Sequence, residues 1–501
     1  MTVTGITYLG IDLGTSEVKV LIMANEGQVI GVAHAPLVWT QPQPGWAEQN
    51  PDTWWEALVE ACRQLKAAYP DYYSQIGAIG LSGQMHGATL LDEQHQILRP
   101  CILWNDSRSE KQCAELTAAH PEFHQIAGNL VMPGFTAPKI AWLRAHEPTI
   151  FNKIAKVLLP KDYLRFLLSG QMVSDMSDAA GTLWLDVEQR SWSAPLLAAT
   201  GLGLQHMPTL VEGSQVAVHL NSISAAALGL KSGIPIAGGA GDNAASAIGI
   251  GAVHTGDSFI SLGTSGVLFS VTDRHRPNSA EAVHAFCHAL PGKWHQMTVM
   301  LSAASALKWI TQTTGHSSEA ELLKKVAELS ADERSLAPVF LPYLSGERTP
   351  HNDAAASGAF VGLRHNHHAA HLAYSVIEGV SFGMRDGLDA LRRAGTQIET
   401  LHLVGGGSKS LLWAQLLANA LAVKIQIGHE SSVGAALGAA RLAKLCVTAP
   451  SVDQLEDICT KPIITSECLP QLDEVRLLER RQQLYRTSYR QLKPLFHAAA
   501  L

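Results

Sequence analysis

Two aspartates stand where short apolar runs meet small residues. Asp12 ends the run 6–11, and Asp242 follows the glycine-rich stretch Gly238–Gly241. Phosphoryl transfer needs a carboxylate that orients the nucleophile, a metal ion on the phosphate oxygens and N–H donors around the phosphates. Asp12 suits a metal ion or its water. An isolated aspartate beside glycine is usually an ordinary turn residue. A functional role for Asp12 and Asp242 is favoured only because glycine and threonine turns accompany them.

The same tetrapeptide, Leu-Gly-Thr-Ser, occurs at 13–16 and at 262–265. In both places an apolar run precedes the turn and another follows it, which predicts a strand–turn–strand unit. Thr15, Ser16, Gly263 and Thr264 suit phosphate binding because glycine lets backbone approach a phosphate and the hydroxyls add donors, and Lys19 could add positive charge. The repeat predicts two related domains, 1–246 and 247–501.

A third turn lies nearer the C-terminus, where Gly405, Gly406 and Gly407 separate a predicted strand at 401–404 from a predicted helix at 411–423. A strand, a glycine turn and a helix in this order form a natural anion or nucleotide contact.

Polyol recognition has candidates in two further loops. His86, expected as a neutral imidazole donor, follows the predicted buried strand 76–81, and the segment from Trp104 through Asn105 to Arg108 adds an aromatic plane, an amide and a guanidinium group. Sugars present hydroxyls over apolar C–H faces, which such groups match. A lone histidine in a turn is more often structural, so this loop alone decides nothing.

Other nucleotide and metal signatures fit poorly. The chain has no G-x-x-x-x-G-K-[ST] loop, which excludes a P-loop kinase. The stretch 239–244 satisfies G-x-G-x-x-A and leaves a dinucleotide-binding alternative open, but Asp242 would repel a pyrophosphate and Asp257 begins a strand instead of ending one. The histidines at 284 and 288 and the tract 365–371 lack completing ligands; we expect a strand or loop and a solvated loop.

Composition favours a compact enzyme. Of 501 residues, 47% are hydrophobic and 16% charged, and the net charge is −7, so we expect neither nucleic acid nor a membrane surface as partner. Seven scattered cysteines without a C-x-x-C pair indicate structural thiols in a reducing compartment. Without a signal peptide or a long apolar run, the expected location is cytoplasmic. The basic stretch 476–490 has helical apolar spacing and predicts an amphipathic C-terminal helix.

Taken in order along the chain, these motifs resemble those of the FGGY carbohydrate kinases over nearly the whole sequence. The segments that carry the resemblance are 10–16, 83–89, 102–106, 134–139, 241–244, 261–266, 344–351, 358–378 and 405–407. The resemblance implies an α/β fold of two actin-like, ribonuclease H-like ATPase domains facing a central cleft, with ATP and Mg²⁺ as cofactors. It implies a small-molecule sugar as substrate, and a homodimer is a further expectation.

The resemblance also implies roles for single residues. Asp242 matches the catalytic base and Asp12 the magnesium-linked aspartate, while Met85 and His86 match the sugar-contacting pair. Further sugar contacts are expected from Trp104, Asp106 and Asn243. The nucleotide contacts are expected from Thr15, Ser16, Lys19, Gly263, Thr264 and Gly405 to Gly407.

The resemblance favours D-xylulose, phosphorylated on O5, as the acceptor. Alternatives are another ketose or polyol, such as L-ribulose, L-xylulose or fuculose; glycerol is disfavoured because Met85 and His86 replace the Arg-Glu pair of glycerol-phosphorylating members. Actin-like and heat-shock ATPases share the implied fold, but only about 60 residues follow Gly438, too few for a separate substrate domain.

Overall fold

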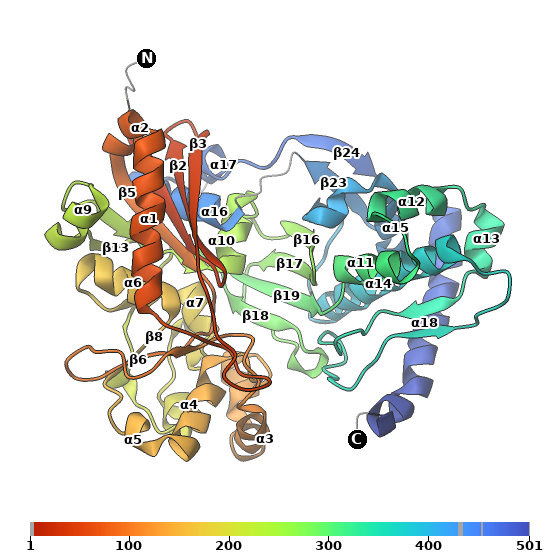
Figure 1. Ribbon diagram of the computed structural model, residues 1–501, viewed down its shortest axis with the longest axis horizontal. Coiled ribbons are helices and arrows are strands. Elements are labelled where there is room, and N and C mark those ends of the chain that lie inside the picture. Colours follow the sequence, from red (N-terminus) through yellow and green to blue (C-terminus); the bar gives the residue numbers. More distant parts are fainter. Residues whose placement is uncertain (1–4, 429–433, 452–453, 500–501) are drawn as a thin grey trace.

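The computed structural model describes residues 5–428, 434–451 and 454–499. Two lobes lie side by side, each built around a mixed β-sheet with helices packed on it (Figure 1). The expected α/β class is therefore confirmed. Among the described residues, no helix combines the length and apolar composition needed to cross a bilayer.

The N-terminal sheet has the order β13-β14-β5-β1-β2-β3, and β15 pairs with the end of β5. Its strands are β1 (Thr7–Leu13), β2 (Glu17–Ala24), β3 (Val29–Pro36), β5 (Ile76–Gly83), β13 (Val216–His219), β14 (Pro235–Ala237) and β15 (Ala240–Gly241). The central strands β1 and β5 are buried on both faces, as their continuous apolar runs predict.

The C-terminal sheet has the order β18-β19-β17-β16-β22-β23-β24. Its strands are β16 (Ser258–Leu262), β17 (Gly266–Thr272), β18 (His284–Cys287), β19 (Trp294–Met300), β22 (Thr400–Val404), β23 (Lys424–Gly428) and β24 (Ile464–Cys468).

The two sheets repeat one topology. In each, the first strand pairs antiparallel with the second, and the second pairs antiparallel with a further strand, β3 or β19. The first strand also pairs parallel with β5 or β22, and a parallel and an antiparallel strand complete the order on that side. The C-terminal sheet has the additional edge strand β18. The first strands are β1 and β16, and each runs into one copy of the Leu-Gly-Thr-Ser turn. The duplication predicted from that tetrapeptide is therefore present in the fold.

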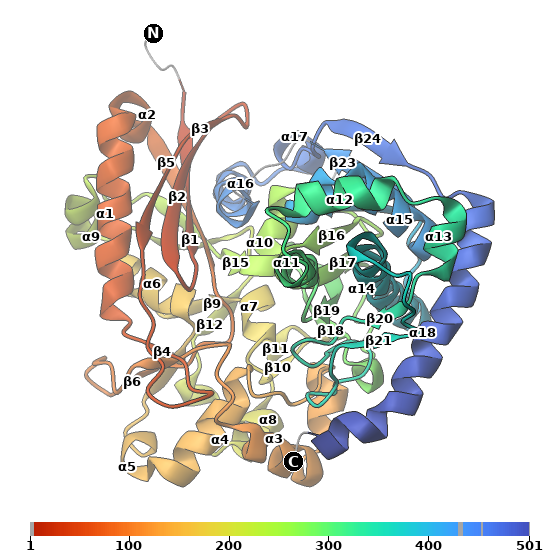
Figure 2. The ribbon, with the colours of Figure 1, turned by 45° about the vertical axis from the view of Figure 1, so that its right-hand side comes forward.

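Short strand pairs and helices surround the sheets (Figures 1 and 2). The pairs are β4 (Glu48–Gln49) with β7 (Cys101–Ile102), β6 (Thr89–Leu91) with β8 (Lys156–Leu158), β9 (Val173–Asp175) with β12 (Thr209–Val211), β10 (Leu185–Asp186) with β11 (Ser191–Trp192), and β20 (Val339–Leu341) with β21 (Ala359–Val361). The N-terminal helices are α1 (Asp52–Ala68), α2 (Pro70–Ser74), α3 (Glu110–Ala119), η1 (Phe123–Ala127), α4 (Thr136–His146), α5 (Pro148–Phe151), α6 (Pro160–Ser169), α7 (Met176–Ala180), α8 (Ala194–Ala199), η2 (Leu204–His206), α9 (Ser222–Leu228) and α10 (Asp242–Gly249). The later helices are η3 (Ser279–Glu281), α11 (Ala304–Thr313), α12 (Glu319–Ala327), α13 (Ala331–Leu336), α14 (Ala369–Arg393), η4 (Gly406–Lys409), α15 (Leu411–Leu421), α16 (Gly434–Thr448), α17 (Leu455–Ile458) and α18 (Leu472–Ala499).

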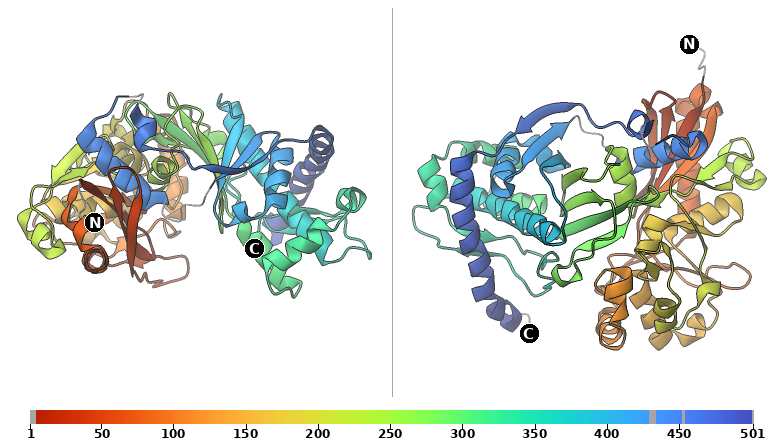
Figure 3. Two further views of the ribbon diagram at one scale, coloured as in Figure 1. Left: turned by 90° about the horizontal axis from the view of Figure 1, so that it is seen from above. Right: turned by 180° about the vertical axis from the view of Figure 1, so that it is seen from behind.

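The predicted C-terminal amphipathic helix is confirmed as α18, which runs along the outer side of the C-terminal lobe (Figure 3). Its inner face buries Leu478 and Tyr485. The seven cysteines are all buried free thiols, as expected.

Helix α16 crosses from the C-terminal part of the chain onto the N-terminal sheet. A Cβ on Gly10 of β1 would lie 2.0 Å from the Ala436 carbonyl oxygen, and one on Gly80 of β5 would lie 1.8 Å from that of Ala439. These glycines let the helix sit directly on the sheet. Because residue 246 lies inside α10, we infer that the domain division predicted after it belongs beyond Gly249.

Two local expectations differ from the structure. Asp242 is the first residue of helix α10 and not part of a glycine turn, because β15 carries the chain up to Gly241. The histidine tract 365–371 is only partly a solvated loop, because His371 is buried in the first turn of α14.

Candidate functional site

Three neighbouring strands bring the two aspartates to one edge of the N-terminal sheet. In the parallel pairing of β1 with β5, Asp12 lies opposite Ser82, and in that of β15 with β5, Gly241 lies opposite Gly83. Carboxyl ends of parallel strands share an edge. Asp12, the loop after Gly83 and Asp242 therefore meet there, as the sequence analysis required of a single site.

The Asp242 carboxylate is held in a form suited to accept a proton near neutral pH. Burial, and then the negative charge of Asp12, raise its pKa to about 7. Asn243 opposes this rise, since its backbone N–H and its side-chain amide donate to Asp242 Oδ1 over 2.7 and 3.0 Å. A base whose pKa matches the working pH is the arrangement that general base catalysis favours.

Asp12 has a spare oxygen that fits a metal ion. Its Oδ1 is buried and accepts no hydrogen bond from any described residue. Burial raises the pKa of Asp12, while the Ser82 hydroxyl and Lys19 act against the rise. Lys19 lies opposite Asp12 across β1 and β2, but its ammonium group is 3.2 Å from Glu17 Oε1. A hard cation such as Mg²⁺ prefers such an oxygen, so the residues present fit the expected metal.

His86 is fixed in an unusual backbone conformation with φ 70°. Thr136 Oγ1 and Lys139 Nζ both donate to the His86 carbonyl, over 3.1 and 3.0 Å. The ring lies 4.7 Å from that of Phe135. Burial, and then the charge on Lys139, lower the pKa of His86 to about 3, so the imidazole is neutral.

The hydrogen bond of His86 decides which polarity it offers a ligand. Nδ1 lies 2.6 Å from the Gly181 carbonyl oxygen, an acceptor, so Nδ1 carries the proton. Nε2 is then an acceptor and can receive a hydroxyl hydrogen. The predicted neutral imidazole therefore offers a ligand an acceptor and not the expected donor, because the Gly181 carbonyl takes its N–H.

A network of amides joins Trp104 to the first phosphate turn. Trp104 Nε1 donates to Thr15 Oγ1 over 3.0 Å, and Thr15 Oγ1 donates to Gln84 Oε1 over the same distance. Gln49 donates to the Thr15 carbonyl and accepts from Gln84. The indole is half exposed. The two glutamines had no assigned role, since an amide far away in sequence gives no local signal.

Asp106 differs from its predicted role. Its Oδ2 accepts from the Ala47 N–H and lies 2.7 Å from Arg108 Nη2, and its Oδ1 accepts from the Arg108 N–H. The side chain is fully buried. The structure therefore uses this carboxylate to hold the loop that carries Trp104, and both oxygens are occupied without a sugar.

The C-terminal lobe contributes two turns that pack against each other. A Cβ on Gly405, whose φ is 87°, would lie 2.7 Å from the Leu262 carbonyl oxygen, and one on Gly407 would lie 2.7 Å from Leu262 Cβ. Leu262 directly precedes Gly263 and the exposed Thr264. The two turns that carry the predicted nucleotide contacts of this lobe thus pack directly on each other, with no room for a side chain at Gly405 or Gly407.

Arg348 reaches from the C-terminal lobe toward the predicted sugar contacts. Its Nη1 lies 2.9 Å from Met132 Sδ of the N-terminal lobe, and its charge acts to lower the pKa of His86. Burial raises the pKa of the neighbouring Glu347 to about 8, and the charge of Arg348 acts against this rise. The sequence analysis used 344–351 as a motif but gave Arg348 no role, because a contact between lobes has no sequence spacing.

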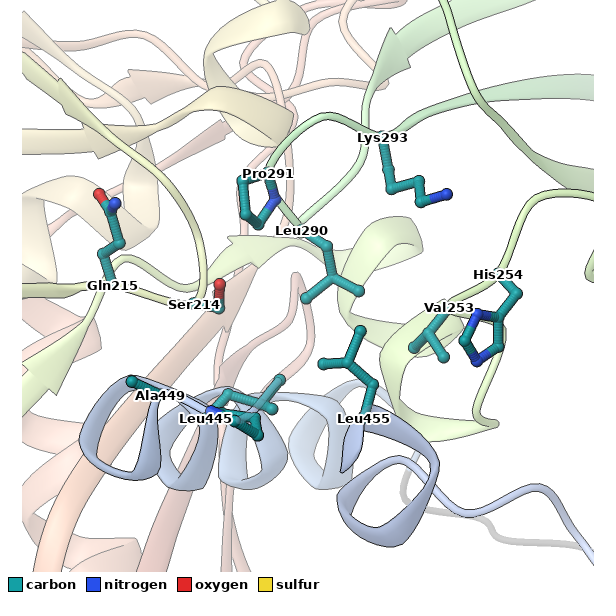
Figure 4. Close-up of a pocket in the computed structure, with 11 residues that line it drawn as sticks. Ser214, Gln215, Val253, His254, Leu290, Pro291, Lys293, Leu445, Ala449 and Leu455 are labelled. Atoms are coloured by element: carbon teal, nitrogen blue, oxygen red, sulfur yellow. The ribbon is translucent and has the colours of Figure 1, made fainter. Parts of the chain in front are cut away.

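A cavity of about 290 Å³ lies away from these groups (Figure 4). Leu445 of α16, Leu455 of α17, Val253 and Leu290 line it, with Lys293 and His254 at its edge. It contains none of the predicted site residues. Lys293 donates to Thr255 Oγ1, and His254 Nε2 lies 3.1 Å from Glu456 Oε1.

Comparisons with known proteins agree with the geometry. The FGGY carbohydrate kinase N-terminal domain matches residues 7–249 and the C-terminal domain matches 258–445. The xylulose kinase of Escherichia coli (strain K12) is 45% identical over 97% of this chain and 99% of its own length, and that of Klebsiella pneumoniae is 47% identical over 88% and 90%. A crystal structure described as a xyloylose kinase from Brucella ovis aligns with a TM-score of 0.94 and 50% identity over 98% of this chain and all of that one. This chain belongs to the FGGY family of carbohydrate kinases.

Proposed function

We propose that the protein transfers the γ-phosphate of ATP to O5 of D-xylulose. As a member of a kinase family it uses ATP, and relatives that cover almost its whole length are xylulose kinases. The observation that carries the proposal is the Asp242 carboxylate. Its pKa lies near 7 at the edge where β5 leads into Met85 and His86.

In the proposed reaction, Asp242 accepts the proton of the attacking hydroxyl as its oxygen bonds to the γ-phosphorus, while the bond from that phosphorus to the β–γ bridging oxygen breaks and ADP leaves. Gly263, Thr264 and the turn Gly405 to Gly407 supply donors to the phosphates, together with Thr15 and Ser16. Asp12 Oδ1 would hold Mg²⁺, which when bound neutralises charge on the β- and γ-phosphate oxygens. Lys19 adds positive charge beside Asp12.

The polarity of the sugar site supports a ketose. His86 Nε2 is an acceptor and suits a sugar hydroxyl, but a ketose also has a carbonyl oxygen, which needs a donor. We assign that role to Arg348, whose guanidinium carries five N–H donors and whose charge acts on His86. Trp104 would cover the apolar face of the sugar, with Met85 and Asn243 as further contacts.

A coupled assay of ADP release tests the substrate. D-Xylulose should exceed glycerol and aldohexoses by at least about 10²-fold in kcat/KM, because a site built to bond several hydroxyls rejects ligands that lack them. A higher kcat/KM for L-ribulose, L-xylulose or fuculose would overturn the assignment of D-xylulose as substrate, but the protein would still be a sugar kinase. The homodimer and the cytoplasmic location expected from the sequence remain predictions.

Arg348→Met tests the specificity argument. It should raise KM for D-xylulose by about 10-fold or more, the cost of leaving the carbonyl oxygen unpaired, with KM for ATP changed little. It should also narrow the preference for the ketose over the corresponding polyol. An unchanged ketose-to-polyol ratio would remove Arg348 from the sugar site.

A further inference from the structure

A five-residue helix, α7, contacts both halves of the proposed sugar site. At its start, Ser177 Oγ accepts the Gly241 N–H over 3.2 Å, and Gly241 directly precedes Asp242. Just beyond its end, the Gly181 carbonyl accepts the Nδ1–H of His86 over 2.6 Å. One short helix therefore connects the base to the sugar-contacting histidine.

The start of α7 is fixed by Asp175. Its Oδ2 accepts from the Ser177 N–H over 2.9 Å, from the Asp178 N–H over 3.2 Å and from the Ser177 hydroxyl over 2.5 Å. Because the hydroxyl proton goes to Asp175, the Ser177 oxygen is left to accept from Gly241. The direction of each bond in this relay is thus determined.

Behind Asp175 lies a group of fully buried charges. Lys161 Nζ lies 2.8 Å from Asp175 Oδ1, 2.6 Å from Asp162 Oδ1 and 3.3 Å from Asp178 Oδ2. Arg165 bonds Asp162 and also donates to the Gly238 carbonyl at the other end of the segment that leads to Asp242. The carboxylates lie close enough to bind a cation, but the Lys161 ammonium group already contacts all three.

The end of α7 leaves no room for a side chain. A Cβ on Gly181 would lie 2.6 Å from His86 Nδ1 and 2.9 Å from Met85 Cε. The Gly181 N–H also bonds the Asp178 carbonyl. The distance from the carbonyl to the imidazole is therefore set by the helix.

We propose that Ser177 is a positioning residue for the base Asp242, and that α7, held by Asp175 and Lys161, sets the placement of Asp242 relative to His86. Buried charge costs stability unless it is fully paired. In this group, Asp175 bonds Ser177 at the start of α7, and Arg165 bonds Gly238, from which the chain leads to Asp242. The inference rests on the proposed function for the identity of the sugar.

Two matched pairs of variants test the proposal. Ser177 and Ser174 are both buried serines, but Ser174 Oγ bonds no described residue. Asp175 and Asp178 are both buried partners of Lys161, but only the Asp175 side chain bonds Ser177. Burial raises the pKa of Asp178, and the charges of Asp162 and Asp175 add to this rise against the effect of Lys161. The Asp178 side chain also bonds neither Ser177 nor Gly241, so an amide in its place should leave the start of α7 unchanged.

We expect Ser177→Ala and Asp175→Asn each to lower kcat by at least about 10-fold, with KM for ATP within about threefold of the wild type. The kcat of Ser174→Ala and of Asp178→Asn should stay near the wild-type value. Ser177→Thr keeps a hydroxyl and should therefore have a higher kcat than Ser177→Ala. The acid limb of the kcat profile should also move to lower pH in Ser177→Ala, since a loosened Asp242 is more hydrated. Gly181→Ala should instead raise KM for the sugar.

The assay uses the sugar with the highest kcat/KM. If that sugar is not D-xylulose, the substrate assignment fails, but the effect of Ser177→Ala on kcat still tests the positioning role. Melting curves separate loss of fold from loss of position. Equal effects of Ser177→Ala and Ser174→Ala on kcat, or an acid limb that does not move in folded Ser177→Ala, would overturn the proposal. So would Asp178→Asn as inactive as Asp175→Asn.

Discussion

The two copies of the Leu-Gly-Thr-Ser turn share a sequence but differ in hairpin geometry and in chemistry. The Gly14 N–H bonds the carbonyl of Glu17, three residues on, whereas the Gly263 N–H bonds that of Ser265, two residues on, each over 3.0 Å. One residue before the turn, β1 carries Asp12, whereas β16 carries Ser261. The residue opposite on the next strand is Lys19 in the first copy and Val267 in the second.

This difference separates binding from catalysis. Both turns can present backbone donors to phosphates, but Asp12 and Lys19 at the strand ends of the first copy are ionisable, and Ser261 and Val267 of the second are not. The Asp12 charge, in turn, raises the pKa of Asp242. We infer that the reacting groups belong to the N-terminal lobe, whereas the C-terminal lobe only binds the nucleotide, whose phosphates the first turn also contacts.

The largest effect is expected from Asp242→Asn. Loss of the base should lower kcat by roughly 10² to 10⁴-fold, with the fold intact. Steady-state kinetics and circular dichroism of the purified variant measure both. Near-normal turnover by the folded variant would exclude Asp242 as the base.

Asp12→Ala and Ser261→Ala compare the two copies directly. Asp12→Ala should lower kcat on the order of 10²-fold, the usual cost of one electrostatic contact to the transition state, and raise the Mg²⁺ concentration needed for half-maximal rate. Ser261→Ala should change kcat by no more than about twofold. Similar losses in both variants would show that the copies share the chemistry.

His86→Ala should act on the sugar alone. Removing a buried acceptor leaves a sugar hydroxyl unpaired, so KM for D-xylulose should rise by roughly 10-fold while KM for ATP stays close to normal. Isothermal titration with sugar in the absence of nucleotide provides a second measurement. A matching rise in KM for ATP would place His86 between the two substrates.

The pH dependence follows from the raised pKa of Asp242. The base is active when deprotonated, so kcat/KM should rise with pH up to about 7 and level off above it. The residual activity of Asp12→Asn should level off at lower pH, because the variant lacks the charge that raises the pKa. A profile that does not move would mean that Asp12 does not influence the base.

The same shift predicts a stability difference. The folded state holds the Asp242 proton up to about pH 7, whereas an ordinary aspartate loses it near 3.8. The contribution of this proton to the free energy of unfolding is fully present below pH 3.8 and is lost as the pH rises to about 7, above which the folded protein holds a buried charge. Asp242→Asn should therefore raise the melting temperature more at pH 8 than at pH 5, and the opposite order would contradict the shifted pKa.

The smallest effects are expected from the two turn threonines. Thr264→Val should raise KM for ATP by roughly three- to tenfold, the value of one hydrogen bond, without changing KM for the sugar. Thr15→Val keeps the backbone N–H that can reach a phosphate but removes the hydroxyl partner of Trp104 and Gln84, so it should instead raise KM for the sugar. Identical patterns for both would argue against different tasks for the two lobes.

The sequence predicted the fold class, the repeated hairpins and the strand ends that carry Asp12 and Asp242, because those signals are local runs and turns. It could not predict contacts that depend on tertiary partners. The His86 tautomer depends on Gly181, the occupation of Asp106 on Arg108, and the position of Arg348 on the approach of two lobes. Helix α16 is another case, since nothing in its sequence indicates that it packs on β1.

Product identification tests the central claim most directly. After incubation of the wild-type protein with ATP, Mg²⁺ and D-xylulose, ³¹P and ¹³C nuclear magnetic resonance should show ADP together with a phosphate ester on C5 of the sugar. The phosphorus should couple to the C5 carbon, and the product should be absent with Asp242→Asn. An ester on another carbon, or free phosphate without any sugar ester, would contradict the proposed reaction.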